Sequence, residues 1–167
     1  MIFVTVGMHP QGFERLIRKA DELAGKINEE VIMQIGGTGY TPENAKHFDF
    51  VTGEEIKELC QKARIVVTHG GVGTILDALA QGTPVIAVPR LKKCGEVIDD
   101  HQSYLVQELE KAGKVTAVYD IEELDSVLAE VKLNLAPTKV DRRLITALRR
   151  YVEEFEQVHC RSRKPQH

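Results

Sequence analysis

The sequence has no long apolar run. None of its 167 residues lies in a stretch that approaches the roughly 18 consecutive apolar residues of a membrane-spanning helix. The opening residues, MIFVTVGMHP, contain no basic segment like the one that begins a secretory signal peptide. We therefore expect a soluble chain, for which attachment to a membrane would require a partner.

Cysteine is scarce and is not spaced for structural use. Cys60, Cys94 and Cys160 are odd in number and far apart, and they form no CxxC pair. This pattern suggests neither a disulfide framework nor a zinc ribbon, and it favours a reducing, cytoplasmic compartment. We also predict no metal site, because the remaining histidines show no ligand spacing. These are His47, His159 and His167.

Charge of one sign does not dominate either. The chain has 22 Lys and Arg against 25 Asp and Glu, for a formal net charge of −3. This balance argues against nucleic acid as a partner, since such binding needs many cations on one face. The length favours one domain with a real core, which we place at residues 1–158, followed by a disordered tail at 159–167.

Two common nucleotide-binding motifs are missing. No GxxxxGK[ST] segment is present, which excludes a P-loop NTPase on motif grounds. A dinucleotide fingerprint would follow the first strand and would need a carboxylate at the end of the second strand. Here the glycine-rich turn comes much later, and the second apolar run ends in QIGG.

What the sequence does contain is a regular alternation of short apolar runs and amphipathic segments. The apolar runs are predicted strands: residues 2–6, 31–35, 48–51, 65–68, 84–88 and 115–118. The amphipathic segments are predicted helices: residues 13–23, 52–62, 74–81, 100–112, a segment after Asp120, and 138–158. Strands that are apolar on both faces belong to parallel sheets. We therefore predict an α/β fold, a doubly wound, Rossmann-like parallel sheet of about six strands.

Several local signals place the ends of these helices. Thr52 with Glu55 three residues later is typical of a capping box at a helix start. Gly82 and Gly113 follow helical segments and are predicted to stop them. Asp120 is predicted to cap the next helix.

The strongest functional signal is the glycine-rich segment Thr68–Thr74, THGGVGT. It follows a predicted strand, and ligands of open parallel sheets bind at the carboxyl ends of the strands. Free N–H groups and the positive dipole end of the next helix favour an anion there, and phosphate is the ligand that we expect. The alternative is a tight turn that needs glycine only for packing. Asp77, one helical turn later, is placed to accept hydrogen bonds from ribose hydroxyls, or is simply an exposed helix acid.

Two other segments reach the same predicted cleft. Asp100 and His101 open a helix, where acidic residues are often only caps. Gln102 beside them is placed to bond sugar hydroxyls. His9 follows the first strand and faces the cleft from another side, as a catalytic candidate or an incidental loop histidine.

Taken in order, the segments VTVG, THGGVGTILDAL, GTPVIAVPR and DDHQ resemble the C-terminal, donor-binding half of family 28 glycosyltransferases. The resemblance covers roughly residues 1–130. It is nearest to the small single-domain members, which are the Alg13-like subunits and the exopolysaccharide glycosyltransferase subunits. The resemblance implies one Rossmann-like half of a GT-B glycosyltransferase.

The resemblance also implies a UDP-sugar site. The diphosphate-binding loop of the family matches four residues: Gly70, Gly71, Gly73 and Thr74. Asp77 matches an acidic position, commonly Glu, that binds the uridine ribose. Val51 matches the region where backbone groups hold the uracil.

The sugar end of the donor is implied by further matches. Gln102 matches a position that contacts the donor sugar, and Asp100 and His101 flank it. Gly7 begins the loop that closes over the donor, and Met8 stands where single-domain relatives often have Thr. We add one inference of our own, that Arg90 or Lys92 on the loop after the fifth strand helps to stabilise the leaving UDP.

The activity that the resemblance implies is transfer of a hexose-type sugar from a UDP-sugar to a lipid-linked acceptor, with inversion and without a metal or other cofactor. The acceptor half and the general base would come from a membrane-anchored, Alg14-like partner that holds this chain at the cytoplasmic face of a membrane. The helix at 138–158 would pack on its own sheet or partly on that partner. Two alternatives stay open: a nucleotide-sugar-binding module or scaffold without transferase activity of its own, and a small enzyme acting on phosphorylated metabolites.

Overall fold

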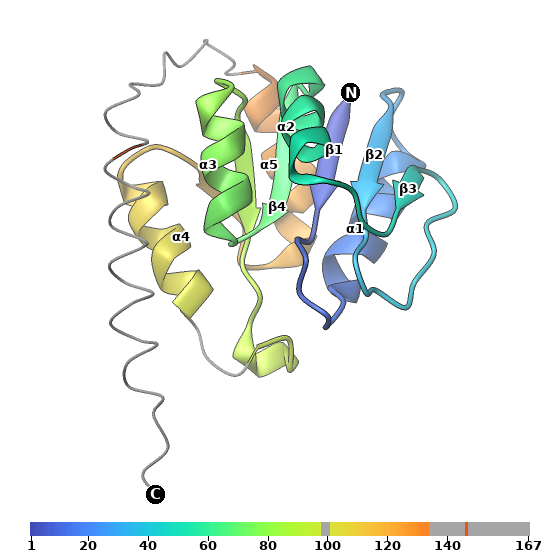
Figure 1. The fold of residues 1–167 in the computed structure, drawn as a ribbon, viewed down its shortest axis with the longest axis horizontal. Helices are drawn as coiled ribbons and strands as arrows, with labels where there is room; N and C mark the ends of the chain where they lie inside the picture. The colour runs from blue at the N-terminus through green and yellow to red at the C-terminus, as the bar shows by residue number, and fades with distance from the viewer. Residues whose placement is uncertain (98–100, 134–145, 147–167) are drawn as a thin grey trace, which may run out of the picture.

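The structure is a computed structural model that describes residues 1–97, 101–133 and 146 (Figure 1). Its elements in chain order are β1 (Ile2–Thr5), α1 (Glu14–Ala24), β2 (Val31–Gln34), β3 (Lys46–Phe48), α2 (Gly53–Lys62), β4 (Ile65–His69), α3 (Val72–Ala80), β5 (Val85–Val88), the 3-10 helix η1 (Lys92–Cys94), α4 (His101–Lys111), β6 (Thr116–Ala117), the 3-10 helix η2 (Ile121–Glu123) and α5 (Leu124–Leu133). None of the helices among these residues is long and apolar enough to cross a bilayer.

The strands form one six-stranded parallel sheet in the order β3-β2-β1-β4-β5-β6. This is the doubly wound, Rossmann-like order, and it confirms the predicted fold class. The chain builds outward from β1 through β2 to β3, and then returns to β4 on the other side of β1. The order therefore reverses between β1 and β4, which is where open α/β sheets hold their ligands.

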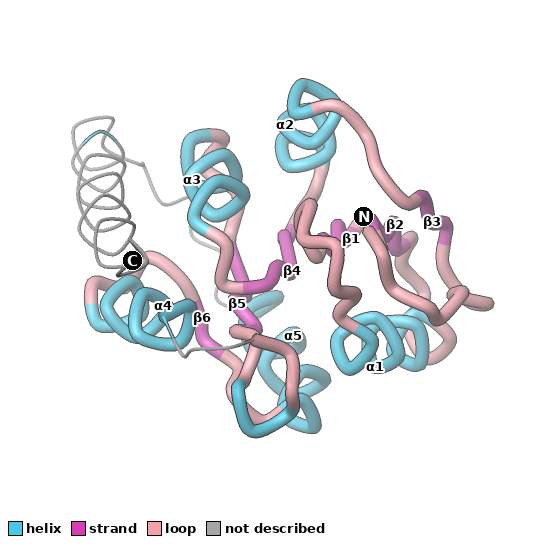
Figure 2. The backbone as a smooth tube through the Cα atoms, turned by 60° about the horizontal axis from the view of Figure 1, so that its bottom comes forward, coloured by secondary structure: helices cyan, strands magenta, loops and turns pink. Residues whose placement is uncertain are grey.

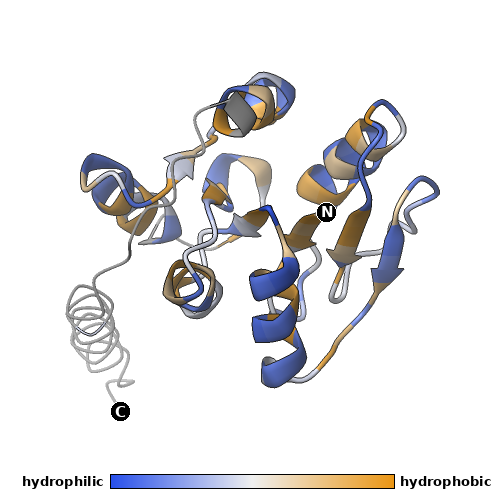
Figure 3. Cartoon of the chain, turned by 90° about the horizontal axis from the view of Figure 1, so that it is seen from above, coloured by the Kyte–Doolittle hydropathy of each residue, from blue (hydrophilic) through white to orange (hydrophobic). Residues whose placement is uncertain are grey.

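Helices cover both faces of the sheet, with α2 and α3 on one side and α1 and α5 on the other (Figure 2). Alternate residues of each strand pack into two separate cores, one on each face of the sheet. Ile2 and Val4 of β1 pack with Leu16 and Ile17 of α1, whereas Phe3 packs with the residues of α2, α3 and α4. Apolar colour is concentrated on the central strands and hydrophilic colour on the outer sides of the helices (Figure 3). Burial on both faces explains why these strands are almost continuously apolar.

The structure corrects two predicted boundaries. The third strand is Lys46–Phe48 and not 48–51, because it is an edge strand with exposed polar residues, and Phe50 and Val51 belong to the loop that follows. Helix α3 begins at Val72, two residues before the predicted start, because Gly71 takes the extended conformation of an N-cap. The glycine-rich segment is therefore partly the first turn of this helix.

The predicted helix ends are confirmed. The side chain of Thr52 accepts a hydrogen bond from the Glu55 N–H, and the capping box is complete. Gly82 and Gly113 adopt positive φ angles of 74° and 64°, the left-handed conformation that ends helices. Asp120 caps η2 through the Glu122 N–H. The predicted helix at 138–158 and the tail at 159–167 lie outside the described residues, except for helical Thr146.

Candidate functional site

A cavity of about 270 Å³ opens at the carboxyl edge of the sheet, where β1 and β4 end side by side. The loops that follow β1 and β5 gather at this edge of the sheet, which is the lower edge in Figure 1. The lining residues come from four segments: Thr5, Gly7, Met8, Gln34, Phe50, Val51, Gly53, Ile56, His69, Gly71, Gly73, Thr74 and Asp77. The cavity thus lies at the topological switch point.

Most of the predicted loop residues meet in this cavity. Its lining includes six of them: Gly7, Val51, Gly71, Gly73, Thr74 and Asp77. Gly70 faces the other way, because a Cβ there would come within 2.8 Å of the Val106 side chain. This glycine lets α4 pack closely against the end of β4.

The start of α3 places backbone N–H groups and the positive end of a helix dipole at the cavity. The N–H groups of Val72, Gly73 and Thr74 lie in the first turn, where no carbonyl of the same helix can accept from them. The positive end of the helix dipole lies at the same place. Asp77 follows one turn later and is half-buried. Within residues 1–97 and 101–133 its carboxylate makes no hydrogen bond or ion pair, so its oxygens are available as acceptors.

His69 is a lining residue that the sequence analysis did not single out. It is the last residue of β4, and its side chain is almost fully buried. Burial, reinforced by the nearby positive charge of Arg90, lowers the pKa of this imidazole from 6.5 to about 4. A Cβ added to Gly7 or Gly71 would collide with the imidazole ring. These two glycines therefore make room for the ring between the loop after β1 and the start of α3.

Thr5 and Gln34 were also missed. Each is the last residue of an otherwise apolar strand, and both are buried. The Thr5 hydroxyl donates to Gln34 Oε1 at 2.6 Å, which joins β1 to β2 at the floor of the cavity. A signal was present, since a polar residue ending an apolar strand points to the ligand edge of the sheet. His69 at the end of IVVTH carries the same signal.

The structure gives Arg90 a different place from the one expected. Its side chain is fully buried and is not part of the cavity lining. The guanidinium donates to the Gly12 carbonyl at 2.7 Å and to the Val6 carbonyl at 3.3 Å, and it stacks over the Phe13 ring at 4.6 Å. We therefore assign Arg90 to support of the loop between Val6 and Gly12, in place of contact with a leaving group.

The remaining predicted residues that the structure describes do not line the cavity. Gln102 lies in the first turn of α4 next to Gly70, and its Oε1 accepts from the Arg90 backbone N–H at 3.4 Å. His101 begins α4, whereas Asp100 lies outside the described residues. His9 is exposed on the loop after β1, and its Nδ1 accepts from the Gln11 N–H at 3.2 Å.

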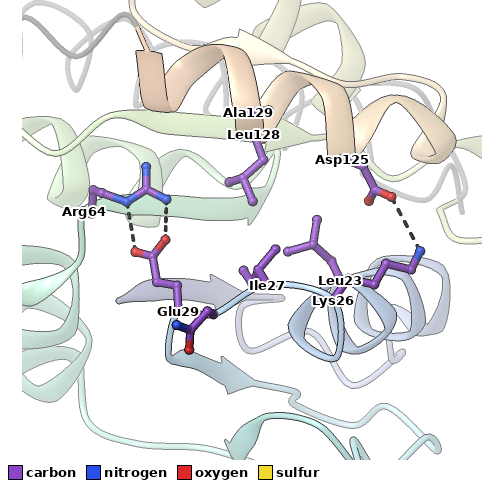
Figure 4. Close-up of a pocket in the computed structure, with 9 residues that line it drawn as sticks. Leu23, Lys26, Ile27, Glu29, Arg64, Asp125, Leu128 and Ala129 are labelled. Carbon is purple, nitrogen blue, oxygen red and sulfur yellow. Dashed lines mark hydrogen bonds and ion pairs between the residues drawn. The ribbon is translucent and has the colours of Figure 1, made fainter.

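A second cavity, of about 410 Å³, lies near the opposite edge of the sheet between α1 and α5 (Figure 4). Its charged groups are already paired. Arg64 holds Glu29 through two hydrogen bonds of 2.9 and 2.6 Å, and Lys26 pairs with Asp125 at 3.7 Å. None of the predicted site residues that the structure describes lines it. We assign the candidate site to the smaller cavity, because it lies at the carboxyl ends of the strands.

Metal-ligating side chains do not cluster in the part of the chain that the structure describes. No group of three or more His, Cys, Asp or Glu residues there is arranged to hold an ion.

Comparison with known proteins gives one family. The model of the family described as "Glycosyltransferase family 28 C-terminal domain" matches residues 1–151. The chain is similar to UDP-N-acetylglucosamine transferase subunit ALG13 from Homo sapiens, with 32% identity over 123 residues, covering 67% of this chain and 10% of that protein. The protein of the same name from Eremothecium gossypii is 36% identical over 128 residues, covering 75% of this chain and 61% of that protein.

Solved structures show the same fold. The calicheamicin glycosyltransferase CalG4 superimposes with a TM-score of 0.62 at 19% identity, covering 98% of this chain and 44% of that one. The chain thus spans less than two thirds of the length of each of these three proteins.

Proposed function

Because this chain belongs to the family of glycosyltransferase family 28 C-terminal domains, we propose that it is the donor-binding subunit of a two-component glycosyltransferase. In this proposal a hexose-type sugar passes from a UDP-sugar to a lipid-linked acceptor. The observation that carries the proposal is the cavity at the switch point, which combines a free helix N-terminus with the carboxylate of Asp77.

The diphosphate of the donor is proposed to lie against the first turn of α3. Gly71 and Gly73 let the backbone approach the phosphates closely, and no atom of the described residues lies within 4 Å of a Cβ built on Gly73. The Thr74 hydroxyl lies in the same turn and is placed to donate to a phosphate oxygen. Several N–H donors and the helix dipole then stabilise the negative charge, and the described lining of the cavity contains no lysine or arginine.

The nucleoside is proposed to lie between the end of β4 and the loop that follows β3. Asp77 accepts hydrogen bonds from the ribose hydroxyls, and backbone groups near Val51 hold the uracil. Phe50 lines the cavity and is 51% exposed, which leaves its ring available to the base. The donor sugar then extends toward Gln102.

The proposed reaction is a displacement with inversion. An acceptor hydroxyl attacks the anomeric carbon, the bond from that carbon to the UDP oxygen breaks, and UDP leaves with the electron pair. The N-terminus of α3 stabilises the charge that develops on UDP. The proton of the acceptor hydroxyl goes to a general base, which we place in the acceptor half. In this scheme no metal ion is required, so a chelator is expected to leave the rate unchanged.

A partner subunit is part of the proposal. The human and Eremothecium relatives are named as subunits of UDP-N-acetylglucosamine transferase. We propose that a membrane-anchored, Alg14-like protein supplies the acceptor site and holds this chain at the cytoplasmic face of the membrane. Comparing the affinities of the chain for different UDP-sugars identifies the sugar, which is that of the donor that binds most tightly.

The second candidate function is a nucleotide-sugar-binding module without transferase activity. One observation favours it. His69, the one imidazole in the described lining of the cavity, is buried and has a pKa of about 4, so it is a weak base at neutral pH. Transfer on addition of the partner supports the transferase, and donor binding without transfer supports the module.

The test of donor binding is a calorimetric titration of the chain with UDP and with UDP-sugars. Asp77→Ala is expected to weaken UDP binding by about 1–3 kcal/mol, since it removes hydrogen bonds from ribose hydroxyls to a charged acceptor. Glu58→Ala is the matched control, because it removes one exposed helix carboxylate whose ion pair, among the described residues, is with Lys62. No binding of UDP by the unmodified chain would overturn the proposal, and unchanged affinity of Asp77→Ala would remove its ribose role.

A further inference from the structure

The side chain of Gln34 makes a complete set of hydrogen bonds at the floor of the cavity. Its Oε1 accepts from the Thr5 hydroxyl at 2.6 Å and from the Gly7 N–H at 3.0 Å. Its Nε2 donates to the carbonyls of Gly7 and Asp49, both at 2.9 Å. The side chain is 2% exposed. These four bonds use both donors and both acceptor sites of the amide.

The partners also fix which way the amide faces. Both partners of Nε2 are carbonyl oxygens, which can only accept, and the Gly7 N–H can only donate. A carboxylate at this position would lack the two donors that these carbonyls need. The amide is therefore matched to its surroundings in chemistry as well as in size.

This amide continues the sheet after the strand pairing has ended. The pairing of β1 with β2 ends at Thr5 opposite Gln34, and that of β2 with β3 ends at Gln34 opposite Phe48. Past those pairs, one side of the Gln34 amide holds Gly7 and the other holds Asp49. The backbone N–H of Gly36 also donates to the Asp49 carbonyl at 3.0 Å.

The two segments held in this way both form part of the cavity wall. Gly7 and Met8 belong to the wall that follows β1, and Phe50 and Val51, directly after Asp49, belong to the wall that follows β3. Gln34 sits on the middle strand of the three and bonds to both walls. Its bonding groups are all occupied by protein partners, so it acts on a ligand through these walls.

We propose that Gln34 is a positioning residue that sets the separation between the Gly7 wall and the Phe50–Val51 wall, and so fits the cavity to the nucleoside of the donor. This inference rests on the proposed function, because the nucleoside is the part of the donor that would lie against the loop after β3, which Gln34 ties to Gly7. Loss of the amide leaves the Gly7 and Asp49 carbonyls without their donor and lets the two loops separate.

Gln34→Met tests the proposal, because it keeps the length of the side chain and removes all four hydrogen bonds. The affinities for UDP, by calorimetry, and for uridine, by NMR titration, are both expected to fall roughly 10–100-fold. A shift of the binding wall by about 1 Å has effects of this size. Thr74→Val, at the phosphate end, is expected to weaken UDP binding and to leave uridine binding unchanged. Thr83→Val is the structural control, because it removes a buried bond to the Cys60 carbonyl away from the cavity and should change both affinities less than twofold.

Gln34→Glu gives a second readout that does not depend on the apolar variant folding. A protonated carboxyl can donate one hydrogen bond and accept others, whereas a carboxylate can only accept. The affinity of Gln34→Glu for UDP, relative to that of the unmodified chain, is expected to recover as the pH falls from about 9 to about 6. A purely structural role predicts equal ligand affinities for all variants that remain folded.

The outcomes separate this inference from the proposed function. If the unmodified chain binds UDP and the folded Gln34 variants bind UDP and uridine within twofold of it, the positioning role is overturned and the proposed function stands. If the unmodified chain binds no UDP, the proposed function fails and this inference fails with it.

Discussion

At the scale of single residues, the site is built around the imidazole of His69. The ring occupies the space that side chains at Gly7 and Gly71 would fill, and it separates the loop after β1 from the first turn of α3. A protonated ring here would be a buried cation near the positive charge of Arg90. Its neutral form is therefore part of the folded structure at neutral pH.

The first prediction concerns the dependence of stability on pH. Since the pKa of His69 is about 4 in the folded chain and 6.5 when unperturbed, the unfolded chain binds more protons between these values. Stability is therefore complete above pH 6.5 and falls as the pH drops toward 4. Between about pH 7 and pH 5 this loss amounts to roughly 2 kcal/mol. Urea unfolding of the unmodified chain and of His69→Gln over this range measures it.

The free energy of unfolding of His69→Gln should change less steeply with pH over that range, because an amide does not titrate there. The acid-sensitive pair of Glu29 and Arg64 does not interfere, since the pKa of Glu29 lies at about 2 and its contribution is lost only below its ordinary value of 4.5. Equal slopes for the two chains would contradict the assignment.

At the scale of the elements, the helix starts control the walls of the cavity. Helix α3 presents its free N–H groups, and α2 contributes Gly53 and Ile56 from its own first turn. The start of α2 is held by a reciprocal cap. The Glu55 carboxylate accepts from the Thr52 backbone N–H and hydroxyl, each at 2.8 Å, and the Glu55 N–H donates back at 3.3 Å.

The second prediction concerns this cap. Thr52→Ala removes the hydroxyl that accepts from Glu55 and is expected to lower the free energy of unfolding by about 1 kcal/mol. Thr52→Ser keeps the hydroxyl and is expected to stay within about 0.5 kcal/mol of the unmodified chain. Urea unfolding followed by circular dichroism measures both. A Ser variant as destabilised as the Ala variant would show that the methyl group, and not the cap, carries the effect.

At the scale of the whole molecule, Arg90 joins the two halves of the sheet. It follows β5, yet its guanidinium bonds to the carbonyls of Val6 and Gly12 on the far side of the switch point. Phe13 packs beneath it at the start of α1. One buried side chain thus ties the loop after β1 to the half of the sheet that contains β4, β5 and β6.

The third prediction follows from this bridge. Arg90→Lys keeps the positive charge. It loses the planar guanidinium that reaches two carbonyls and stacks on Phe13. We therefore expect the free energy of unfolding to fall by roughly 2–3 kcal/mol. Arg18→Lys is the matched control. Arg18 also stacks on an aromatic ring, that of Tyr40, and pairs with Glu14, but it is 55% exposed, so its loss should stay below about 0.5 kcal/mol. Comparable losses in the two variants, measured by urea unfolding, would contradict the bridging role.

The fold class and much of the site were predictable from local signals. Alternating apolar runs and amphipathic segments indicated the parallel sheet, and the glycines at 71 and 73 lay where the cavity formed. The third strand was misplaced because Phe50 and Val51 are apolar for a different reason: they line the cavity in a loop, while the polar edge residues Lys46 and His47 form the strand. Apolar character alone does not distinguish these two uses.

The sequence by itself determined the features that depend on neighbouring residues: the helix caps, the stops at Gly82 and Gly113, the buried strands and the glycine-rich helix start. Tertiary structure alone decided the contacts between residues far apart in the chain. It turned Gly70 toward α4 and Gly71 toward His69, buried Arg90 beneath the first loop, and brought Gln34 against both Gly7 and Asp49. The physical reason is that a buried polar group must find a partner wherever the packed chain supplies one, and the order of the strands decides which segments lie within reach.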